Sequence, residues 1–169
     1  ELIVRNPKPV IAEVAGTATA AGCQLVASCY LAMASNTVKF ATPGVNLGLF
    51  CSTPMVALSR NVSRKHAMEM LLSGDMVDAS RAEQIGLINR AFNPDQLTSE
   101  TMAMALKIAS KSTMTIAIGK RAFYEQAEMP LNEAYAYTSQ VMTENMLTRD
   151  AEEGIGAFLG KRTPEWQDQ

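Results

Sequence analysis

Extended and helical patterns alternate along the first half of the chain. Residues 17–29 are rich in alanine and place apolar side chains at a spacing that predicts a buried helix packed closely against other backbone. Gly16 predicts the turn that precedes this helix, and Pro43 with Gly44 breaks a later extended segment. Short β-branched or apolar runs predict extended segments at residues 10–14, 30–35 and 38–43.

Helical spacing dominates from Thr53 onward. Ser52 or Thr53 is predicted to cap the first of these helices, with Pro54 in its first turn. Asp150 and Glu153 are predicted to form a capping pair for the last one. The expected helices cover residues 53–61, 64–72 and 79–85 and, after a strand at 87–92, most of 95–169, with breaks near residues 112, 130 and 148.

Composition narrows the class of protein. The 169 residues are 47% hydrophobic and carry a net charge of −2, which indicates a globular protein of one piece and no nucleic-acid partner. No apolar run approaches the roughly 20 residues that span a bilayer, so no membrane association is expected. Three cysteines without paired spacing and one histidine predict neither a disulfide framework nor a metal site.

The remaining composition gives two further expectations. The chain opens on Glu1 and runs straight into an apolar stretch, so we expect it to be the interior part of a longer protein. The three cysteines without paired spacing predict a reducing compartment, the cytoplasm or the mitochondrial matrix. Eleven methionines, many of them in residues 101–146, are predicted to fill the core at helix contacts rather than to form a promiscuous binding surface.

Four stretches, in order, resemble the crotonase (enoyl-CoA hydratase/isomerase) superfamily. They are "KPVIAEVAGTATAAGCQLVASC", "FATPGVNLGLF", "AMEMLLSGDMVDASRAEQIGLINRAF" and "RDAEEGIGAFLGKRTPEW". The first is similar to the superfamily's strand, small-residue loop and helix, the second to its FxxPExxLG segment, and the last to its terminal signature. The resemblance is greatest to the enoyl-CoA hydratase domain-containing subgroup, of which some members are mitochondrial.

The resemblance implies an α/β fold of stacked β-β-α units, the crotonase (ClpP-like) fold, followed by a helical region that mediates trimerisation. Residues 1–92 would then be the C-terminal part of the core, and residues 93–169 the helical region that also covers coenzyme A. It also implies an acyl-CoA thioester as ligand, a role in fatty acid metabolism, a homo-trimer or hexamer, and no cofactor apart from the coenzyme A of the substrate.

In this family two backbone N–H groups hold the thioester oxygen, and the resemblance assigns one of them to Ala21. Donors fixed where an enolate develops its charge contribute about 3–4 kcal/mol each. The second donor is expected from a segment that precedes this sequence. The alternative is that Ala18 to Gly22 are small only because a helix packs there against a sheet.

The two glutamates of family hydratases correspond here to Gln24 and Gly44. An amide can orient a water but cannot take its proton, and glycine offers no group at all. Losing one positioned acid or base commonly lowers a rate by ~10²–10⁴, so we expect little hydratase activity. Cys51, His66 and Glu13 are nearby or titratable, and none of them is expected to replace the glutamates.

Further ligand contacts are expected on both sides of these positions. The AF–xx–K motif implies that Phe158 and Lys161 approach coenzyme A; the alternative is an anchoring Phe158 and a solvated Lys161. Gly154 and Gly156 suggest close approach of another helix or subunit. Two hypotheses stay open, an enzyme with altered acid–base groups and a non-catalytic acyl-CoA-binding or scaffold protein. The other expected substrate contacts are Ala18, Gly22, Pro43, Leu47 and Phe50.

Overall fold

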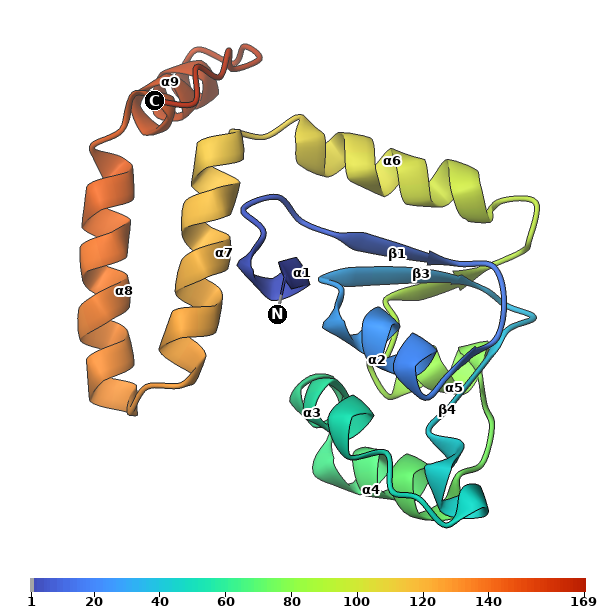
Figure 1. Ribbon diagram of the computed structural model, residues 1–169. Coiled ribbons are helices and arrows are strands. Elements are labelled where there is room, and N and C mark those ends of the chain that lie inside the picture. The colour runs from blue at the N-terminus through green and yellow to red at the C-terminus, as the bar shows by residue number, and fades with distance from the viewer. Residues whose placement is uncertain (1) are drawn as a thin grey trace. The chain divides into compact units, whose positions relative to one another are not determined.

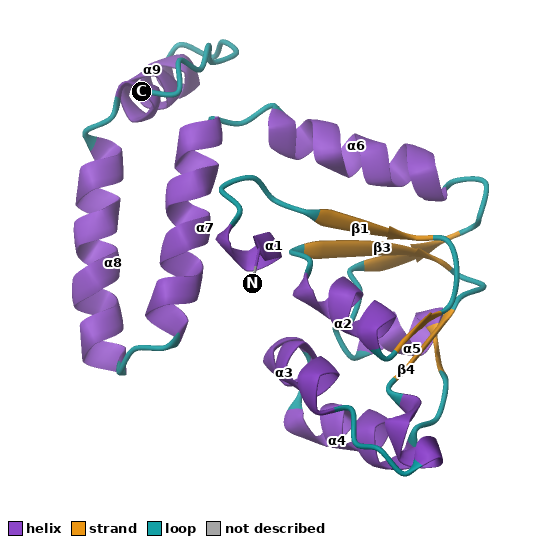
Figure 2. Cartoon of the chain, viewed as in Figure 1, coloured by secondary structure: helices purple, strands orange, loops and turns teal. Residues whose placement is uncertain are grey.

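The computed structural model describes residues 2–169 and divides them into two compact units (Figure 1). One unit comprises Val10–Ala105, and the other comprises the residues up to Pro9 together with Leu106–Gln169. Each unit has its own packing and is described separately. Mixed helices and strands confirm the predicted α/β class (Figure 2).

Two small sheets organise the unit of residues 10–105. In the first sheet, β1 (Ile11–Val14), β3 (Leu31–Ser35) and β6 (Arg90–Phe92) run parallel in the order β1-β3-β6. In the second, β4 (Lys39–Ala41) pairs parallel with β2 (Ala18–Thr19) and antiparallel with β5 (Val77–Asp78). Parallel neighbours must be joined by crossovers, and the helices between these strands supply them.

The crossover helices bury their apolar faces in one core. The largest fully buried apolar side chains are Phe40 of β4, Met33 of β3, and Leu58, Met70 and Leu71 of the helices. The Asn61 amide joins two helices, because its Nδ2 donates to the Ala27 and Ala57 carbonyls at 2.7 and 2.8 Å. The helices of this unit are α2 (Ala21–Ser28), α3 (Ser52–Asn61), α4 (Arg64–Ser73), α5 (Ala79–Gln84) and the first part of α6 (Leu97–Ala109).

Most predicted helix boundaries in this unit are confirmed. Gly74 ends α4 in the left-handed conformation, and Asp78 caps α5 by accepting from the Arg81 N–H. The side-chain cap predicted for α3 is absent, because the N-cap is Cys51 and α3 already begins at Ser52. Sequence patterns missed the two-residue strands β2 and β5 and the 3-10 helix η1 (Pro43–Leu47).

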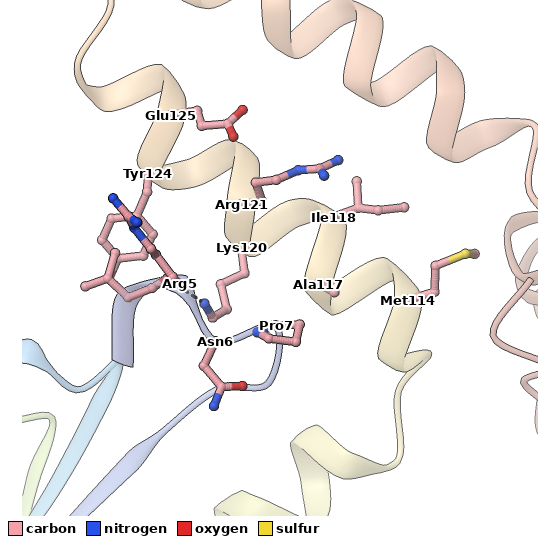
Figure 3. A pocket seen from close by; sticks show the side chains of 11 residues that line it. Arg5, Asn6, Pro7, Met114, Ala117, Ile118, Lys120, Arg121, Tyr124 and Glu125 are labelled. Atoms are coloured by element: carbon pink, nitrogen blue, oxygen red, sulfur yellow. Dashed lines mark hydrogen bonds between the residues drawn. The ribbon is translucent and has the colours of Figure 1, made fainter. Parts of the chain in front are cut away.

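The second unit consists of helices and the C-terminal segment. Helix α7 (Thr113–Ala127) packs with α8 (Leu131–Met146), and α9 (Arg149–Leu159) follows. A short helix, α1 (Leu2–Arg5), lies against α7, where the Lys120 Nζ donates to the Val4 carbonyl at 2.9 Å (Figure 3). The breaks predicted near residues 112, 130 and 148 are confirmed.

The predicted cap of α9 is wrong, and the prediction for the methionines holds only in part. Thr148 caps α9 by accepting from the Ala151 N–H, whereas Asp150 and Glu153 bind the chain beyond the helix. Two methionines of this unit, Met142 and Met146, are more than half exposed and so do not fill a core, whereas Met114 and Met129 are half-buried. A Cβ built at Gly154 would lie 3.3 Å from the ring of Trp166, so this glycine has a close neighbour within the chain.

Candidate functional site

The carboxyl ends of β2 and β4 form one edge of the second sheet. The two strands are parallel, with Ala18 opposite Phe40 and Thr19 opposite Ala41, and the Ala20 N–H continues the ladder to the Ala41 carbonyl at 3.0 Å. Helix α2 leaves this edge after β2, and η1 leaves it after β4. In parallel sheets ligands bind outside the carboxyl ends of the strands, so this edge is the candidate site.

Ala20, a residue with strained backbone angles, precedes α2 and sets the direction in which the helix starts. Ala20 has φ 47° and ψ −113°, a conformation that L-residues other than glycine rarely adopt. Such strain costs on the order of 1–3 kcal/mol and tends to occur at functional sites. The turn lets the Gln24 N–H bond the Ala20 carbonyl at 3.0 Å while the following residue, Ala21, begins the helix.

The Ala21 N–H is available to a ligand. Ala21 is exposed, and within residues 2–169 its N–H forms no hydrogen bond. The first N–H groups of a helix lack intrahelical partners and carry the positive end of its dipole. A Cβ built on Gly22 would meet the Ala18 Cβ at 3.8 Å, an ordinary contact, so tight packing does not by itself require glycine at residue 22.

The Gln24 side chain lies one turn into α2 and is half-buried. Its backbone carbonyl accepts from the Ser28 hydroxyl at 2.7 Å, and its amide can donate to or accept from a water. It provides no titratable group at this edge.

The space beside Gly44 is already filled. A Cβ built there would lie 2.8 Å from the Leu49 carbonyl oxygen and 2.9 Å from the Cys51 Sγ, both closer than real Cβ contacts. The Leu49 N–H donates to the Gly44 carbonyl at 2.9 Å and holds this loop in place. Residue 44 therefore has neither a side chain nor room for one without a shift of residues 49–51.

Apolar side chains border the loop after Gly44. Leu47, Leu49 and Phe50 are 79%, 67% and 43% exposed, whereas Pro43 is half-buried. Thr42, which joins β4 to η1, is fully buried, and its Oγ1 has no hydrogen-bond partner in the described part of the chain. Sequence reasoning missed Thr42, since nothing in its neighbours distinguishes a buried hydroxyl from a paired one.

The Cys23 thiol of α2 is not activated. Burial and the neighbouring Cys51 raise the pKa of the Cys23 thiol to about 11, so it stays protonated and unreactive at neutral pH. All three cysteines are free thiols. Within residues 2–169 no group of three or more histidine, cysteine or acidic side chains is arranged to hold a metal ion.

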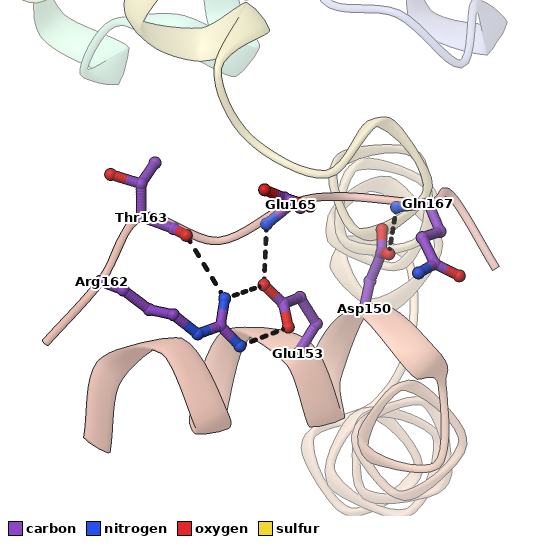
Figure 4. Close-up of polar contacts among 6 residues, drawn as sticks. All are labelled: Asp150, Glu153, Arg162, Thr163, Glu165 and Gln167. Carbon is purple, nitrogen blue, oxygen red and sulfur yellow. Dashed lines mark hydrogen bonds and ion pairs between the residues drawn. The ribbon is translucent and has the colours of Figure 1, made fainter. Parts of the chain in front are cut away.

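The other two expected ligand residues lie in the second unit, at the end of α9. Phe158 is 81% exposed, so it does not anchor the helix, and Lys161 is exposed with φ 51°. The segment beyond them is fixed to α9. Arg162 pairs with Glu153 at 2.5 and 2.7 Å, and the Glu165 N–H donates to the same carboxylate at 2.8 Å (Figure 4).

Comparison with known proteins assigns this architecture. The whole of residues 1–169 matches the family described as enoyl-CoA hydratase/isomerase. A mouse protein named "Enoyl-CoA hydratase domain-containing protein 3, mitochondrial" is 52% identical over 166 residues, which are 98% of this chain and 55% of the mouse protein. The chain thus spans about half the length of the curated relatives it matches.

Solved structures agree with this match. A crystal structure of enoyl-CoA hydratase from Mycobacterium smegmatis superimposes with a TM-score of 0.95 and 53% identity, over 97% of this chain and 64% of that one. The human enoyl Coenzyme A hydratase domain-containing protein 3 gives a TM-score of 0.94 at 53% identity, over 98% and 65%. These likenesses confirm the crotonase fold and the subgroup that the sequence motifs predicted.

Proposed function

The chain belongs to the enoyl-CoA hydratase/isomerase family, and from this membership we propose that it binds acyl-CoA thioesters and stabilises an enolate oxyanion through the Ala21 N–H. One observation carries the proposal: the N–H of the exposed residue Ala21, at the start of α2, is not bonded within residues 2–169 and lies at the joint carboxyl edge of two parallel strands. Coenzyme A enters as part of the substrate, and no separate cofactor is proposed.

The physical reason lies in where charge develops. When a thioester loses its α-proton, negative charge moves to the carbonyl oxygen, and a fixed N–H donor stabilises that charge without having to reorganise. Ala20 contributes by orienting the donor, because its unusual φ turns the chain directly from β2 into α2. The helix dipole acts in the same direction.

Hydration is the family reaction that this site supports least. It requires two carboxylates around one water, and these positions hold Gln24 and the side-chain-free Gly44. A base for the α-proton would have to come from outside these two positions. We therefore propose enolate chemistry without efficient hydration, such as α-proton exchange or isomerisation.

A second candidate function is a non-catalytic acyl-CoA-binding or scaffold protein. The loop packed against Gly44 favours it, because the Leu49 carbonyl and Cys51 fill the space of an acid or base (2.8 and 2.9 Å from a built Cβ). Both candidates share the thioester ligand, and they differ in whether bound thioester is chemically changed.

Several finer features are also proposals. Gln24 would orient a water or the ligand, and Ala18, Gly22, Pro43, Leu47 and Phe50 would contact the acyl group. Phe158 and Lys161 would contact adenine and phosphates in a homo-trimer or hexamer, where an exposed ring and cation suit such groups. We also propose a mitochondrial location, as in the names of the relatives. None of the helices in residues 2–169 has the length and apolarity needed to span a membrane.

The decisive experiment incubates the protein in D₂O with saturated and 2-enoyl-CoA thioesters and follows mass by mass spectrometry. Deuterium at the α-carbon without gain of water is the expected result. Gain of water at a rate typical of hydratases would contradict the proposed loss of hydration. Unchanged mass with measurable thioester binding would favour the non-catalytic candidate.

A matched pair of variants tests the donor itself. Proline is tolerated at the first position of a helix and removes only the N–H, but the Ala20 Cβ would crowd its ring. We therefore compare Ala20→Gly with the double variant Ala20→Gly/Ala21→Pro. The single variant should keep the exchange rate, whereas the double variant should lose roughly 10²–10³-fold. Equal rates in the two variants would show that Ala21 is not the donor.

A further inference from the structure

The turn that ends α9 has a lysine where glycine is usual. Gly160 is the C-cap of the helix, and Lys161 follows it with φ 51°. The Lys161 N–H donates to the Phe158 carbonyl at 3.2 Å. The Arg162 N–H donates to the Ala157 carbonyl at 3.0 Å, which completes a Schellman motif. The left-handed position of this motif is usually glycine, because a Cβ is disfavoured there, so Lys161 lowers the stability of the turn.

The Lys161 ammonium is available to a ligand. Lys161 is exposed, and its side chain forms no hydrogen bond or ion pair within residues 2–169. Phe158, three residues earlier on the last turn of α9, has an exposed ring. Backbone strain tends to occur where a side chain has a function. An exposed cation and an exposed ring suit a ligand that carries phosphates and an aromatic base.

An ion pair fixes the chain that follows Lys161. The Arg162 guanidinium binds both oxygens of the Glu153 carboxylate, at 2.5 and 2.7 Å. Figure 4 shows the Glu165 N–H converging on the same carboxylate, at 2.8 Å. These bonds lower the pKa of Glu153 to about 2, so the carboxylate is ionised at neutral pH. A bidentate pair adds geometric specificity, and it therefore holds the residue next to Lys161 in one orientation.

We propose that Glu153 and Arg162 are positioning residues, whose ion pair keeps Lys161 in the left-handed conformation and so directs its ammonium toward a phosphate of coenzyme A. This role rests on the function proposed above, in which Lys161 meets the phosphates of an acyl-CoA. The alternative is that the ion pair only anchors the residues beyond α9. A positioning role affects affinity for the phosphate-bearing part of the ligand alone, whereas an anchoring role affects stability.

Two thioesters separate the parts of the ligand. Octanoyl-CoA carries the adenine and the nucleotide phosphates, whereas octanoyl-pantetheine has the same acyl group and lacks both. Isothermal calorimetry with the intact protein measures the dissociation constant of each. Lys161→Met should weaken octanoyl-CoA binding by roughly tenfold, because it removes a charge-assisted hydrogen bond. It should leave octanoyl-pantetheine binding unchanged.

Glu153→Gln tests the positioning role. It keeps the size of the side chain and removes its charge, so octanoyl-CoA binding should weaken while octanoyl-pantetheine binding stays the same. The effect should vanish in a Lys161→Met background, because the ion pair then has no ammonium to position. Glu152→Gln makes the same change at the exposed neighbouring residue and is the matched control, with both affinities expected at wild-type values.

Lys161→Gly separates ligand contact from folding. Glycine adopts a positive φ without strain, so this variant should raise the thermal midpoint of unfolding by roughly 2–4 °C. It should nevertheless lose octanoyl-CoA affinity as Lys161→Met does. A lower midpoint with wild-type affinity would mean that the lysine serves the fold, and would overturn the proposal.

Other results would also count against the positioning role. Weaker binding of both thioesters in Glu153→Gln, or a loss that persists in the Lys161→Met background, would assign the ion pair to anchoring. Octanoyl-CoA affinity that neither single variant changes would overturn the proposal while leaving the thioester ligand in place. No binding of either thioester by the wild type would instead contradict the proposed function, and the positioning role with it.

Circular dichroism checks that the variants fold. Arg162→Gln breaks the same ion pair from the other side and replaces Glu153→Gln if that variant unfolds. The same selective loss of octanoyl-CoA affinity is expected from it, and full retention of that affinity would contradict the positioning role.

Discussion

At the scale of single residues, the backbone around Gly44 limits which chemistry a substitution can restore. Gly44→Glu would bring a Cβ within 2.8 Å of the Leu49 carbonyl oxygen, so residues 49–51 would have to move. We expect a loss of about 1–3 kcal/mol in unfolding free energy, as for overpacked cores, and no gain of hydratase activity. Urea unfolding and a crotonyl-CoA hydration assay check this. Wild-type stability together with hydration would show that the loop yields easily.

Thr42 gives a second prediction at this scale. Its buried Oγ1 lacks a partner in residues 2–169, and an unsatisfied buried hydroxyl costs about 1–3 kcal/mol. Thr42→Val keeps the shape and removes the hydroxyl, so it should raise the unfolding free energy by about 1 kcal/mol. Thr42→Ser keeps the hydroxyl, loses a methyl group, and should lower it. Destabilisation by valine, measured by thermal denaturation, would mean that a bound water pairs the hydroxyl.

The sequence alone anticipated part of this site. Motif order placed Ala21, Gln24 and Gly44 on their segments, and the structure finds the segments of Ala21 and Gly44 leaving one sheet edge. The sequence could not reveal the positive φ of Ala20, because nothing local to an alanine predicts that conformation. The sequence also could not predict that the space beside Gly44 is filled. That space is filled by Leu49 and Cys51, and their positions depend on how the loop after Gly44 folds back.

At the scale of elements, the sequence predicted those helix ends that depend only on residues nearby in the chain. Asp78 and Gly74 mark helix ends by chemistry within a few residues, and both ends are confirmed. The strands β2 and β5 have two residues each and exist only because both pair with β4. Their pairing is tertiary, so no pattern within residues 17–29 could separate β2 from the helix that follows it.

The C-terminal segment, residues 160–169, is bound by two carboxyl groups of α9 whose protonation depends on pH. The Arg162 side chain and the Glu165 N–H lower the pKa of Glu153 from 4.5 to about 2, and the Ser112 hydroxyl with the Gln167 N–H lowers the pKa of Asp150. A carboxyl whose folded pKa is depressed stabilises the fold above its unfolded pKa and loses that contribution as pH falls. The segment should therefore detach between about pH 4.5 and pH 2.

Trp166 reports this detachment, because it is the chain's single tryptophan and its Nε1 donates to the Ser110 carbonyl at 2.8 Å. Its fluorescence should change over that pH range. In Glu153→Gln the neutral amide should weaken the segment already at neutral pH and flatten the acid transition. The exposed neighbour Glu152 gives the control Glu152→Gln, which should titrate like the wild type. A transition unaffected by Glu153→Gln would assign the pH response elsewhere.

At the scale of the whole molecule, the exposed apolar side chains of the helical unit bear on assembly. Leu131, Leu147 and Phe158 are 74%, 83% and 81% exposed. A single exposed leucine or phenylalanine is common on protein surfaces, but its contact with water is unfavourable. Exposed apolar side chains on successive helices are expected where subunits meet. Together with family membership, they support the proposed homo-oligomer.

The prediction at this scale is that Leu131→Glu/Leu147→Glu lowers the oligomeric state, because burying two carboxylates in a subunit contact is strongly unfavourable. Light scattering after size exclusion should show a smaller particle, with helicity retained in circular dichroism. Asn132→Glu, at an exposed position beside Leu131, is the control that adds charge without removing apolar surface. If the double variant keeps the wild-type mass, subunits do not meet through these ends of α8. Phe158 of α9, which is 81% exposed, would then be the next position to test in the same way.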